Sequence, residues 1–283
     1  MTSPTISKPI LTERIISKRL MLLVLLICAI APVFPLVATS EEFIERDSLR
    51  EVMAKNGVDG AFVGYDVSAG RVFLINAPRA RKRLNPASTF KIANSLIALE
   101  TGVVRDENEV IPYRSETPPL IREWARDMSM REAIKLSNVP IYQELARRIG
   151  LGRYHEWLSR LTYGNAETGS VVDRFWLDGP LAISAVEQAY FVAELALRKL
   201  PLSRRAQDVV CDIMKYETVA DHTIYAKTGW CRSCKPQIGW WVGWVQQRGG
   251  VFAFALNIDV VGVADLDKRI PVAKELLSQF GAI

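Results

Sequence analysis

The chain has 283 residues, of which 49% are hydrophobic and 24% charged, and it could form one large domain or two small ones. This composition excludes a disordered chain, a collagen-like rod and a polytopic membrane protein. Two histidines and four cysteines are too few for a multi-metal site or a dense disulfide scaffold. Four basic residues and one acidic residue fall within the first 40 positions, so the rest of the chain carries only +2 of the formal +5 charge. A nucleic-acid-binding surface needs basic residues clustered on the folded part, so we expect no nucleic-acid partner.

The N-terminus has the pattern of a secretory signal peptide over residues 1–40. A basic start leads into an apolar run from Leu20 to Ala38, and Ala38-Thr39-Ser40 supplies the small residues of a cleavage site. The alternative is an uncleaved anchor, because nineteen apolar residues could span a bilayer. Pro32 and Pro35 favour cleavage. We therefore expect a periplasmic protein that has no membrane contact after cleavage, in a compartment that permits disulfides.

Residues 41–283 are predicted to form one domain, since no repeat, low-complexity tract or flexible linker interrupts them. Runs rich in β-branched and aromatic residues between turn signals predict a hairpin near the start and three strands near the end. The expected strands are Gly60–Asp66, Arg71–Ile75, Thr223–Trp230, Ile238–Gln246 and Val251–Asp259.

The chain between these strand regions has helical periodicity, and one more helix ends the domain. The expected helices are Ser88–Thr101, Met130–Lys135, Ile141–Arg148, Arg153–Arg160, Ala185–Leu200 and Leu266–Phe280. This order predicts an α/β (α+β) fold in which both chain ends build one antiparallel sheet, flanked by helices and interrupted by an all-helical lobe.

Ser88-Thr-Phe-Lys91 opens the first predicted helix, so Ser88 and Lys91 face the same side. Unpaired N–H groups in the first turn favour negative charge there. A serine hydroxyl needs a base to become a nucleophile, but His155 and His222 fall in a helix and at a strand start and are expected to be structural. A lysine whose pKa is lowered by burial can take this role. For the isolated motif, a helix-capping serine beside a solvated lysine is the alternative.

Two further motifs favour the interpretation of Ser88 as a nucleophile with Lys91 as its base. Ser137-Asn138-Val139 precedes Pro140, which disfavours helix at the residue before it, so a turn between two helices is expected here. Lys227-Thr228-Gly229 ends a predicted strand, where a cation and a hydroxyl could bind a substrate carboxylate and glycine lets a ligand approach the backbone. In this order, the three motifs are associated with penicillin-recognising serine enzymes.

The chain from residue 41 onward resembles the class D, or oxacillinase-type, serine β-lactamases. The resemblance rests on Pro86-Ala-Ser-Thr-Phe-Lys-Ile-Ala-Asn-Ser95, Ser137-Asn-Val139, Tyr163-Gly-Asn165, Phe175-Trp-Leu177, Lys227-Thr-Gly229 and Gly239-Trp-Trp-Val-Gly-Trp244. It implies the penicillin-recognising serine enzyme fold and a monomer or homodimer that acts on small β-lactam substrates. Oxacillin-type penicillins are the expected substrates, with carbapenems as a further class.

The resemblance also implies a role for each matched residue. Ser88 would be the nucleophile, and Lys91 would react with carbon dioxide to give an N6-carboxylated lysine that acts as general base, with no other cofactor and no metal. Ser137 would pass a proton to the departing lactam nitrogen, and Lys227 would shape the electrostatics.

The remaining implied roles concern binding. The backbone N–H groups of Ser88 and Trp230 would form an oxyanion hole. Substrate binding is expected of Thr228, Gly229, Arg269 and Val139, although a slip of one residue would exchange Arg269 for Lys268. The carbamate would be supported by Phe175, Trp176 and Leu177, with Trp176 donating its indole N–H.

Cys231-Arg-Ser-Cys234 follows Trp230 in the loop between two predicted strands. A redox-active pair, half a zinc site and a disulfide are the alternatives, and a disulfide suits an exported protein. Cys211 would remain a buried single thiol. Trp230 and Trp241 are the tryptophans of this sheet that could face substrate.

Two other functions remain open at this stage. The first is a penicillin-sensing receptor domain, which would share the fold and motifs but stay acylated. The second is a cell-wall transpeptidase or carboxypeptidase, which would also stay acylated by the lactam. Turnover of a chromogenic lactam separates an enzyme from both.

Overall fold

The computed structural model describes residues 41–115 and 118–283. The predicted signal peptide over residues 1–40 lies outside the described residues. In the described ranges, no helix has the length and apolar character needed to cross a membrane.

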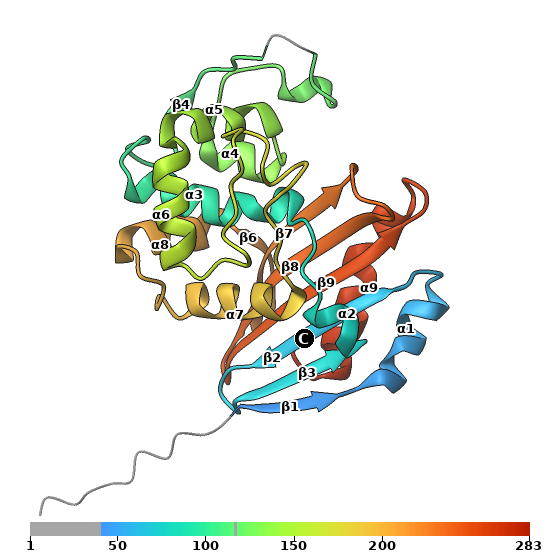
Figure 1. The fold of residues 1–283 in the computed structure, drawn as a ribbon. Helices are drawn as coiled ribbons and strands as arrows, with labels where there is room; N and C mark the ends of the chain where they lie inside the picture. Colours follow the sequence, from blue (N-terminus) through green and yellow to red (C-terminus); the bar gives the residue numbers. More distant parts are fainter. Residues whose placement is uncertain (1–40, 116–117) are drawn as a thin grey trace, which may run out of the picture. The chain divides into compact units, whose positions relative to one another are not determined.

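Seven strands of the described chain form one sheet in the order β1-β3-β2-β9-β8-β7-β6 (Figure 1). They are β1 Glu42–Glu45, β2 Gly60–Asp66, β3 Arg71–Ile75, β6 Lys215–Val219, β7 His222–Cys231, β8 Gln237–Gln247 and β9 Gly250–Val260. An early strand and the last strand of the chain meet at the centre of the sheet, where β2 pairs antiparallel with β9. Both chain ends therefore build one sheet, as predicted.

The two edge strands were not predicted. At one edge, β1 runs parallel to β3, so the sheet is mixed and not purely antiparallel. Its sequence, Glu-Phe-Ile-Glu, is short and mostly exposed, so it lacks the alternation that marks a half-buried strand. At the other edge, β6 is also mostly exposed. Pairing with a neighbour, and not a hydrophobic pattern, defines both strands.

The helices lie on the two faces of the sheet and in the segment between β3 and β6 (Figure 1). They are α1 Arg50–Lys55, α2 Ala77–Arg81, α3 Lys91–Glu100, α4 Met130–Lys135, α5 Val139–Ile149, α6 Leu151–Arg160, α7 Ala185–Ala196, α8 Arg204–Ile213 and α9 Asp265–Gln279. Short 3₁₀ turns are η1 Asp47–Leu49, η2 Ala87–Phe90 and η3 Arg122–Trp124, and a small ribbon pairs β4 Val110–Ile111 with β5 Met128–Ser129. Of these helices, α1, α2 and α8 were not predicted.

Capping residues explain where two of the helices begin. Ser129 caps α4 and Ser184 caps α7, and each forms a capping box with the glutamate three residues later, Glu132 and Glu187. Such a box satisfies backbone N–H groups that have no partner within the helix.

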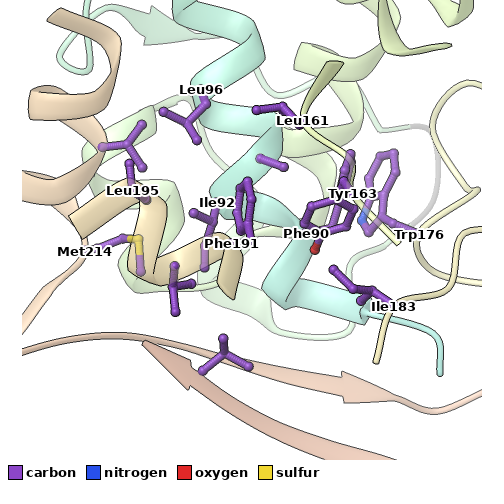
Figure 2. Close-up of a cluster of buried hydrophobic side chains, with 14 of the residues drawn as sticks. Phe90, Ile92, Leu96, Leu161, Tyr163, Trp176, Ile183, Phe191, Leu195 and Met214 are labelled. Atoms are coloured by element: carbon purple, nitrogen blue, oxygen red, sulfur yellow. The ribbon is translucent and has the colours of Figure 1, made fainter. Parts of the chain in front are cut away.

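The sheet separates two hydrophobic clusters. On one face, α1 and α9 pack through residues such as Val52, Val272 and Leu276 against Phe254 and Trp241 of the sheet. On the other face, the larger cluster joins α3, α5 and α7 to the strands. Figure 2 shows part of this larger cluster, in which Phe90 and Trp176 lie close together. The site described next sits where η2, α3 and β7 meet.

Candidate active site

Ser88 lies in the 3₁₀ turn η2, immediately before α3, and not in the first turn of an α-helix as predicted. The turn begins with Ala87 at a φ of 48°, a left-handed conformation that is unfavourable for a residue with a Cβ. Such strained positions cluster at functional sites because the surrounding structure enforces them. Here the strain precedes the residue predicted to be the nucleophile.

Lys91 points back toward Ser88. Its Nζ atom is 2.8 Å from the Oγ of Ser88, and the lysine side chain is completely buried. The ring of Tyr142 faces the same nitrogen, with its centroid 5.2 Å away. Burial, together with the positive charge of Lys227, lowers the pKa of Lys91 well below its usual value. A neutral amine beside a serine hydroxyl can accept that hydroxyl's proton.

Ser137 occupies the turn between α4 and α5, with a left-handed φ of 56°. The buried side chain of Asn138 caps α5 by accepting from the N–H of Ile141 at 3.0 Å. The predicted turn is therefore present, but Val139 already belongs to α5, so the expectation that Pro140 keeps it out of helix was wrong. Proline is tolerated in the first turn because an N–H there has no partner within the helix.

Lys227 connects the turn at Ser137 to strand β7. Its Nζ lies 2.9 Å from the Oγ of Ser137 and 3.0 Å from the carbonyl oxygen of Thr228. Burial, and to a smaller extent the charge of Arg269, lowers the pKa of Lys227 to about 7. A lysine with this pKa can exchange a proton with a neighbouring hydroxyl near neutral pH.

Gly229 lets β7 pass close to η2. A Cβ atom at this position would lie 3.0 Å from the carbonyl oxygen of Pro86 and 3.1 Å from the Cγ2 atom of Thr89. A side chain would push the strand away from the turn that carries Ser88. Glycine thus keeps the Lys-Thr-Gly segment beside the serine.

Arg269 reaches the same place from α9. It donates to the carbonyl oxygens of Gly229 at 2.8 Å and of Leu266 at 2.6 Å, and burial lowers its pKa to about 10. Lys268 instead pairs with Asp265 at 2.9 Å. The structure therefore places Arg269, and not its neighbour, beside the Lys-Thr-Gly segment.

A cavity of about 490 Å³ opens over these groups. The predicted residues that line it are Ser88, Ser137, Val139, Leu177, Thr228, Gly229, Trp230 and Arg269. Residues that the sequence reasoning missed add an apolar wall: Leu120, Ile121, Trp124, Leu136 and Pro140. The one sequence signal for this wall is the apolar Pro118-Pro119-Leu120-Ile121, which belongs to no regular element.

Phe175 and Trp176 are buried beside the turn that carries Ser88 and do not line the cavity. The ring of Phe90, next to Lys91 in the chain, packs 5.2 Å from Phe175 and 5.4 Å from Trp176, measured between centroids. Figure 2 shows Phe90 beside Trp176. The indole N–H of Trp176 has no hydrogen-bond partner in the described chain. A buried donor without a partner is rare and needs an explanation.

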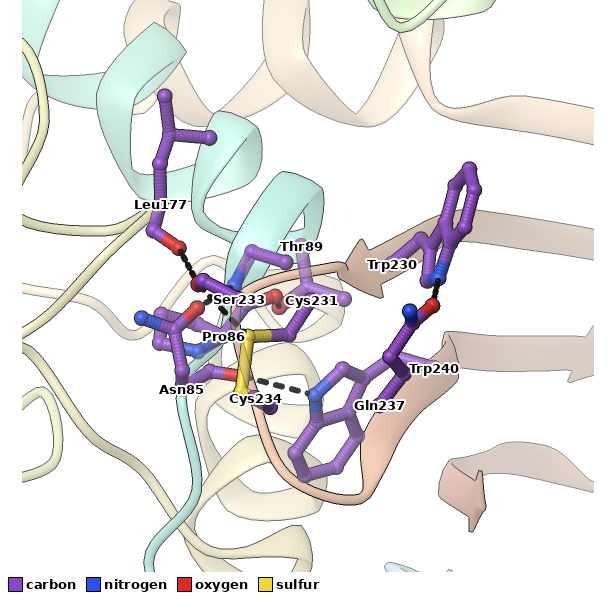
Figure 3. The surroundings of a disulfide bond; sticks show 11 residues. Asn85, Pro86, Thr89, Leu177, Trp230, Cys231, Ser233, Cys234, Gln237 and Trp240 are labelled. Atoms are coloured by element: carbon purple, nitrogen blue, oxygen red, sulfur yellow. Dashed lines mark hydrogen bonds between the residues drawn. A yellow bond between two sulfur atoms is a disulfide. The ribbon is translucent and has the colours of Figure 1, made fainter. Parts of the chain in front are cut away.

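The loop between β7 and β8 holds a disulfide between Cys231 and Cys234 (Figure 3). Within this loop, the Oγ of Ser233 donates to the carbonyl oxygen of Leu177 at 3.0 Å and so ties the loop to the Phe175–Leu177 segment. The remaining described cysteine, Cys211, is a buried free thiol. Within the described ranges, no three His, Cys, Asp or Glu side chains could together hold a metal ion.

The tryptophans of the sheet differ in their surroundings. Trp230 is partly exposed at the cavity and donates its indole N–H to the side chain of Gln237 at 2.9 Å (Figure 3). Trp241 is fully buried against Phe254 and Tyr216. The expectation that Trp241 could face substrate was therefore wrong, because it packs under α9 on the face of the sheet away from Ser88.

Comparisons with known proteins agree with this geometry. Residues 55–278 match the family model described as the penicillin binding protein transpeptidase domain. The β-lactamase OXA-48 of Klebsiella pneumoniae is 40% identical over 250 residues, which cover 88% of this chain and 94% of that protein. The crystal structure of FUS-1, a class D β-lactamase from Fusobacterium nucleatum, superposes with a TM-score of 0.81 at 39% identity and covers 84% of this chain and 99% of its own. The chain belongs to the class D β-lactamases.

Another solved class D β-lactamase, YbXI from Nostoc, is 37% identical and also superposes with a TM-score of 0.81. The family and the fold class predicted from the sequence are thus confirmed. In this class D enzyme, Tyr163-Gly164-Asn165 forms a turn: the side chain of Asn165 accepts from the N–H of Ala182 and donates to the carbonyl of Pro180.

Proposed function

We propose that this protein hydrolyses the β-lactam ring of penicillin-type antibiotics through a serine acyl-enzyme and thereby confers resistance to them. The observation that carries the proposal is the 2.8 Å contact between the Oγ of Ser88 and the Nζ of the buried Lys91. It lies at a cavity that also presents Ser137, Thr228 and Arg269. We further propose that the protein works in the periplasm, in keeping with its N-terminal signal pattern.

Acylation begins when the oxygen of Ser88 attacks the lactam carbonyl carbon and its proton passes to the base at Lys91. The backbone N–H groups of Ser88 and Trp230 would stabilise the negative oxygen that develops on that carbon. The carbon–nitrogen bond of the ring then breaks, and the nitrogen takes a proton from Ser137. Lys227, 2.9 Å from Ser137, replaces that proton.

Before deacylation, the base at Lys91 loses the proton of Ser88 to solvent and Lys227 regains one from solvent. A water molecule then attacks the ester carbonyl carbon while that base accepts one of its protons. The bond from the carbonyl carbon to the oxygen of Ser88 breaks, and that oxygen regains a proton. The product is the ring-opened acid, and Ser88 returns to its starting state. Arg269 and Thr228 would hold the substrate carboxylate during both stages through a cation and a hydroxyl.

We propose that the base is Lys91 carboxylated on its Nζ by carbon dioxide. Three features fit such a group: an amine whose pKa is lowered by burial, surroundings rich in apolar side chains, and the indole N–H of Trp176, which has no partner in the described chain. The carbamate supplies a carboxylate oxygen that accepts a proton. Lys91 provides the neutral amine, and Trp176 would donate to the carbamate, with Phe175 and Leu177 excluding water.

Oxacillin-type penicillins are the proposed substrates, with carbapenems as a further class. The apolar wall of Leu120, Ile121 and Trp124 suits an apolar substituent on the lactam. A steady-state panel of a penicillin, oxacillin, a cephalosporin and a carbapenem would rank these substrates.

Turnover of a chromogenic β-lactam tests the activity. A hydrolase cycles many times per molecule, whereas a penicillin sensor or a transpeptidase gives one stoichiometric burst and stays acylated. Ser88→Ala is the matched control. A single burst from the wild-type protein would contradict the proposal.

Carbon dioxide tests the base. Acidic buffer depleted of carbon dioxide should reduce turnover, because protonation of the amine and the carbamate releases carbon dioxide, and bicarbonate should restore it. Labelled carbon dioxide should appear on Lys91. Normal turnover after depletion, without label on Lys91, would make the unmodified lysine the base.

A further inference from the structure

A second cavity, of about 720 Å³, lies beside the loop between β7 and β8. Its walls come from α2 and the residues that follow it, from the segment after Leu177, and from the loop residues Ser233–Pro236. Among residues 41–115 and 118–283, only Asp178 and Ser233 line both this cavity and the active-site cavity. No step of the proposed mechanism uses it.

Most of the charged side chains in this second cavity are already paired. Arg79 donates to Asp259 at 2.7 Å and to the buried Asn257 at 2.6 Å. Arg83 pairs with the carboxylate of Glu187 at 2.6 Å. These contacts hold the walls together and leave little net charge at these positions.

Asp178, the acidic residue at the boundary between the two cavities, is also paired. Arg174, which lines the active-site cavity, donates to its carboxylate. The carboxylate of Asp178 therefore offers little negative charge to the second cavity.

Two lysines remain. Lys82, just after α2, and Lys235, in the β7–β8 loop, both line the second cavity, and the ammonium group of neither makes a hydrogen bond or an ion pair within the described chain. Their two positive charges come from different elements and lie in the wall of one cavity. Unpaired cations in a concave wall attract anions, because the low-dielectric protein concentrates their field.

The loop that carries Lys235 also borders the active site. It leads from Trp230, whose backbone N–H is assigned to the oxyanion hole, through Ser233, which hydrogen-bonds the carbonyl oxygen of Leu177. The disulfide between Cys231 and Cys234 links two residues of this segment and restricts its conformation. A ligand bound to Lys235 would therefore contact the same loop that lines part of the active-site cavity.

We propose that the second cavity binds a small polyanion bearing phosphate or carboxylate groups, through Lys82 and Lys235, and that this binding changes the turnover of the active site. Phosphate and carboxylate oxygens are the acceptors that a lysine ammonium group favours. The proposed binding of the anion rests only on the second cavity and its two lysines. The effect on turnover rests on the proposed β-lactamase function.

Isothermal titration with inorganic pyrophosphate, and separately with citrate, tests the binding at constant ionic strength, since salt screens exposed charges. The wild-type protein should bind with measurable heat. The double variant Lys82→Gln/Lys235→Gln should lose at least about tenfold in affinity, which corresponds to about 1.4 kcal/mol. Binding of one probe and not the other identifies whether phosphate or carboxylate is preferred.

Lys55→Gln/Lys199→Gln is the matched control, because it removes the same charge from two exposed lysines outside both cavities. It should bind the probe as the wild type does. Equal affinity in the wild type and in the Lys82/Lys235 variant would place the anion elsewhere, for example at Arg269, and overturn the proposal. No heat with either probe would overturn it as well.

Turnover of the chromogenic lactam, measured with and without pyrophosphate, tests the coupling. We expect at least a twofold change in kcat or KM in the wild type and in the control, and none in the Lys82→Gln/Lys235→Gln variant, whose basal activity should be unchanged. Binding without any change in turnover would refute the coupling. Absence of turnover from the wild type under all conditions would instead count against the proposed function, and the titration would still decide the binding.

Discussion

Arg269 lies close enough to Lys227 for its positive charge to lower the pKa of that lysine. Burial is the main cause that lowers the pKa of Lys227 to about 7, and the positive charge of Arg269 is the second. Arg269 itself is held by the carbonyl oxygen of Gly229 at 2.8 Å, two residues from Lys227 in the same strand. The protonation of Lys227 near neutral pH is therefore a property of the pair.

Removing Arg269 should shift the pH profile. We expect the limb of kcat/KM that belongs to Lys227 to lie near pH 7 in the wild type and to move to higher pH in Arg269→Gln, because loss of a nearby cation favours the protonated lysine. The overall value of kcat/KM should also fall, since the arginine is proposed to bind the substrate carboxylate. A pH profile over the range 5–10 measures both effects. An unmoved limb would mean that Lys227 titrates independently of Arg269.

Ser88→Ala should reduce the turnover rate by at least about 10⁴-fold, the scale for removal of a nucleophile. The variant should still fold, because Ser88 donates no cap to a helix. Steady-state kinetics and a thermal melt together measure this. A rate within tenfold of the wild type in a folded variant would dismiss Ser88 as the nucleophile.

Lys91→Met should abolish activity yet raise the stability of the fold. The pKa of Lys91 is lowered by burial in the folded protein, so below pH 10.5 the unfolded chain binds a proton that the folded chain resists, and stability falls as the pH falls from 10.5 toward the folded pKa. Methionine removes this cost. We expect the Tm at pH 7, in buffer free of carbon dioxide, to rise by about 2–4 °C.

The gain from Lys91→Met should shrink as the pH approaches 10.5, since the lysine is then neutral in both states. Lys135→Met serves as the control because Lys135 is exposed on the neighbouring α4. A Tm that falls at pH 7, or a gain that grows with pH, would show that burial of the amine is not costly here.

Trp176→Phe should make turnover more dependent on bicarbonate. Phenylalanine keeps most of the ring packing against Phe90 and Phe175 but removes the N–H donor that has no partner in the described chain. Deacylation should slow more than acylation, so an acyl-enzyme should accumulate and be visible by intact-protein mass spectrometry. Equal bicarbonate dependence in variant and wild type would remove the indole from the proposed support of Lys91.

Replacing both Cys231 and Cys234 by serine should leave the chemistry intact and mainly loosen the loop between β7 and β8. A disulfide that closes so short a loop stabilises the fold by about 1–2 kcal/mol. Chemical denaturation measures the loss, and Cys211→Ser provides a control thiol. Free thiols at both Cys231 and Cys234, in addition to that of Cys211, in protein isolated from the periplasm would contradict the disulfide.

Several features could be predicted from the sequence because local physics determines them. Ser88 and Lys91 are three residues apart, so one turn of chain suffices to bring them together. The strands β8 and β9 and the helix α4 were expected within a few residues of their bounds, since apolar and aromatic runs between turn signals mark the strands and helical periodicity marks the helix. The family could be predicted too, because its motifs are short and lie in local turns.

Other features depended on pairing between distant segments. The parallel strand β1 and the edge strand β6 have no hydrophobic pattern of their own and exist because β3 and β7 offer them hydrogen bonds. The helix α8 was missed even though it buries Val210 and Cys211. Its local signals were present in the sequence, since Ser203 caps it by accepting from the N–H of Ala206.

The sequence by itself determined which groups can do the chemistry: a serine and a lysine one turn apart, a second serine, and a Lys-Thr-Gly segment. Only the tertiary structure decided that Lys227, ninety residues along the chain, lies 2.9 Å from Ser137 and that Arg269, and not Lys268, faces the cavity. It also decided the low pKa of Lys91. The physical reason is that a pKa depends on the solvent and charge around a group, and distant segments create that environment only when they pack together.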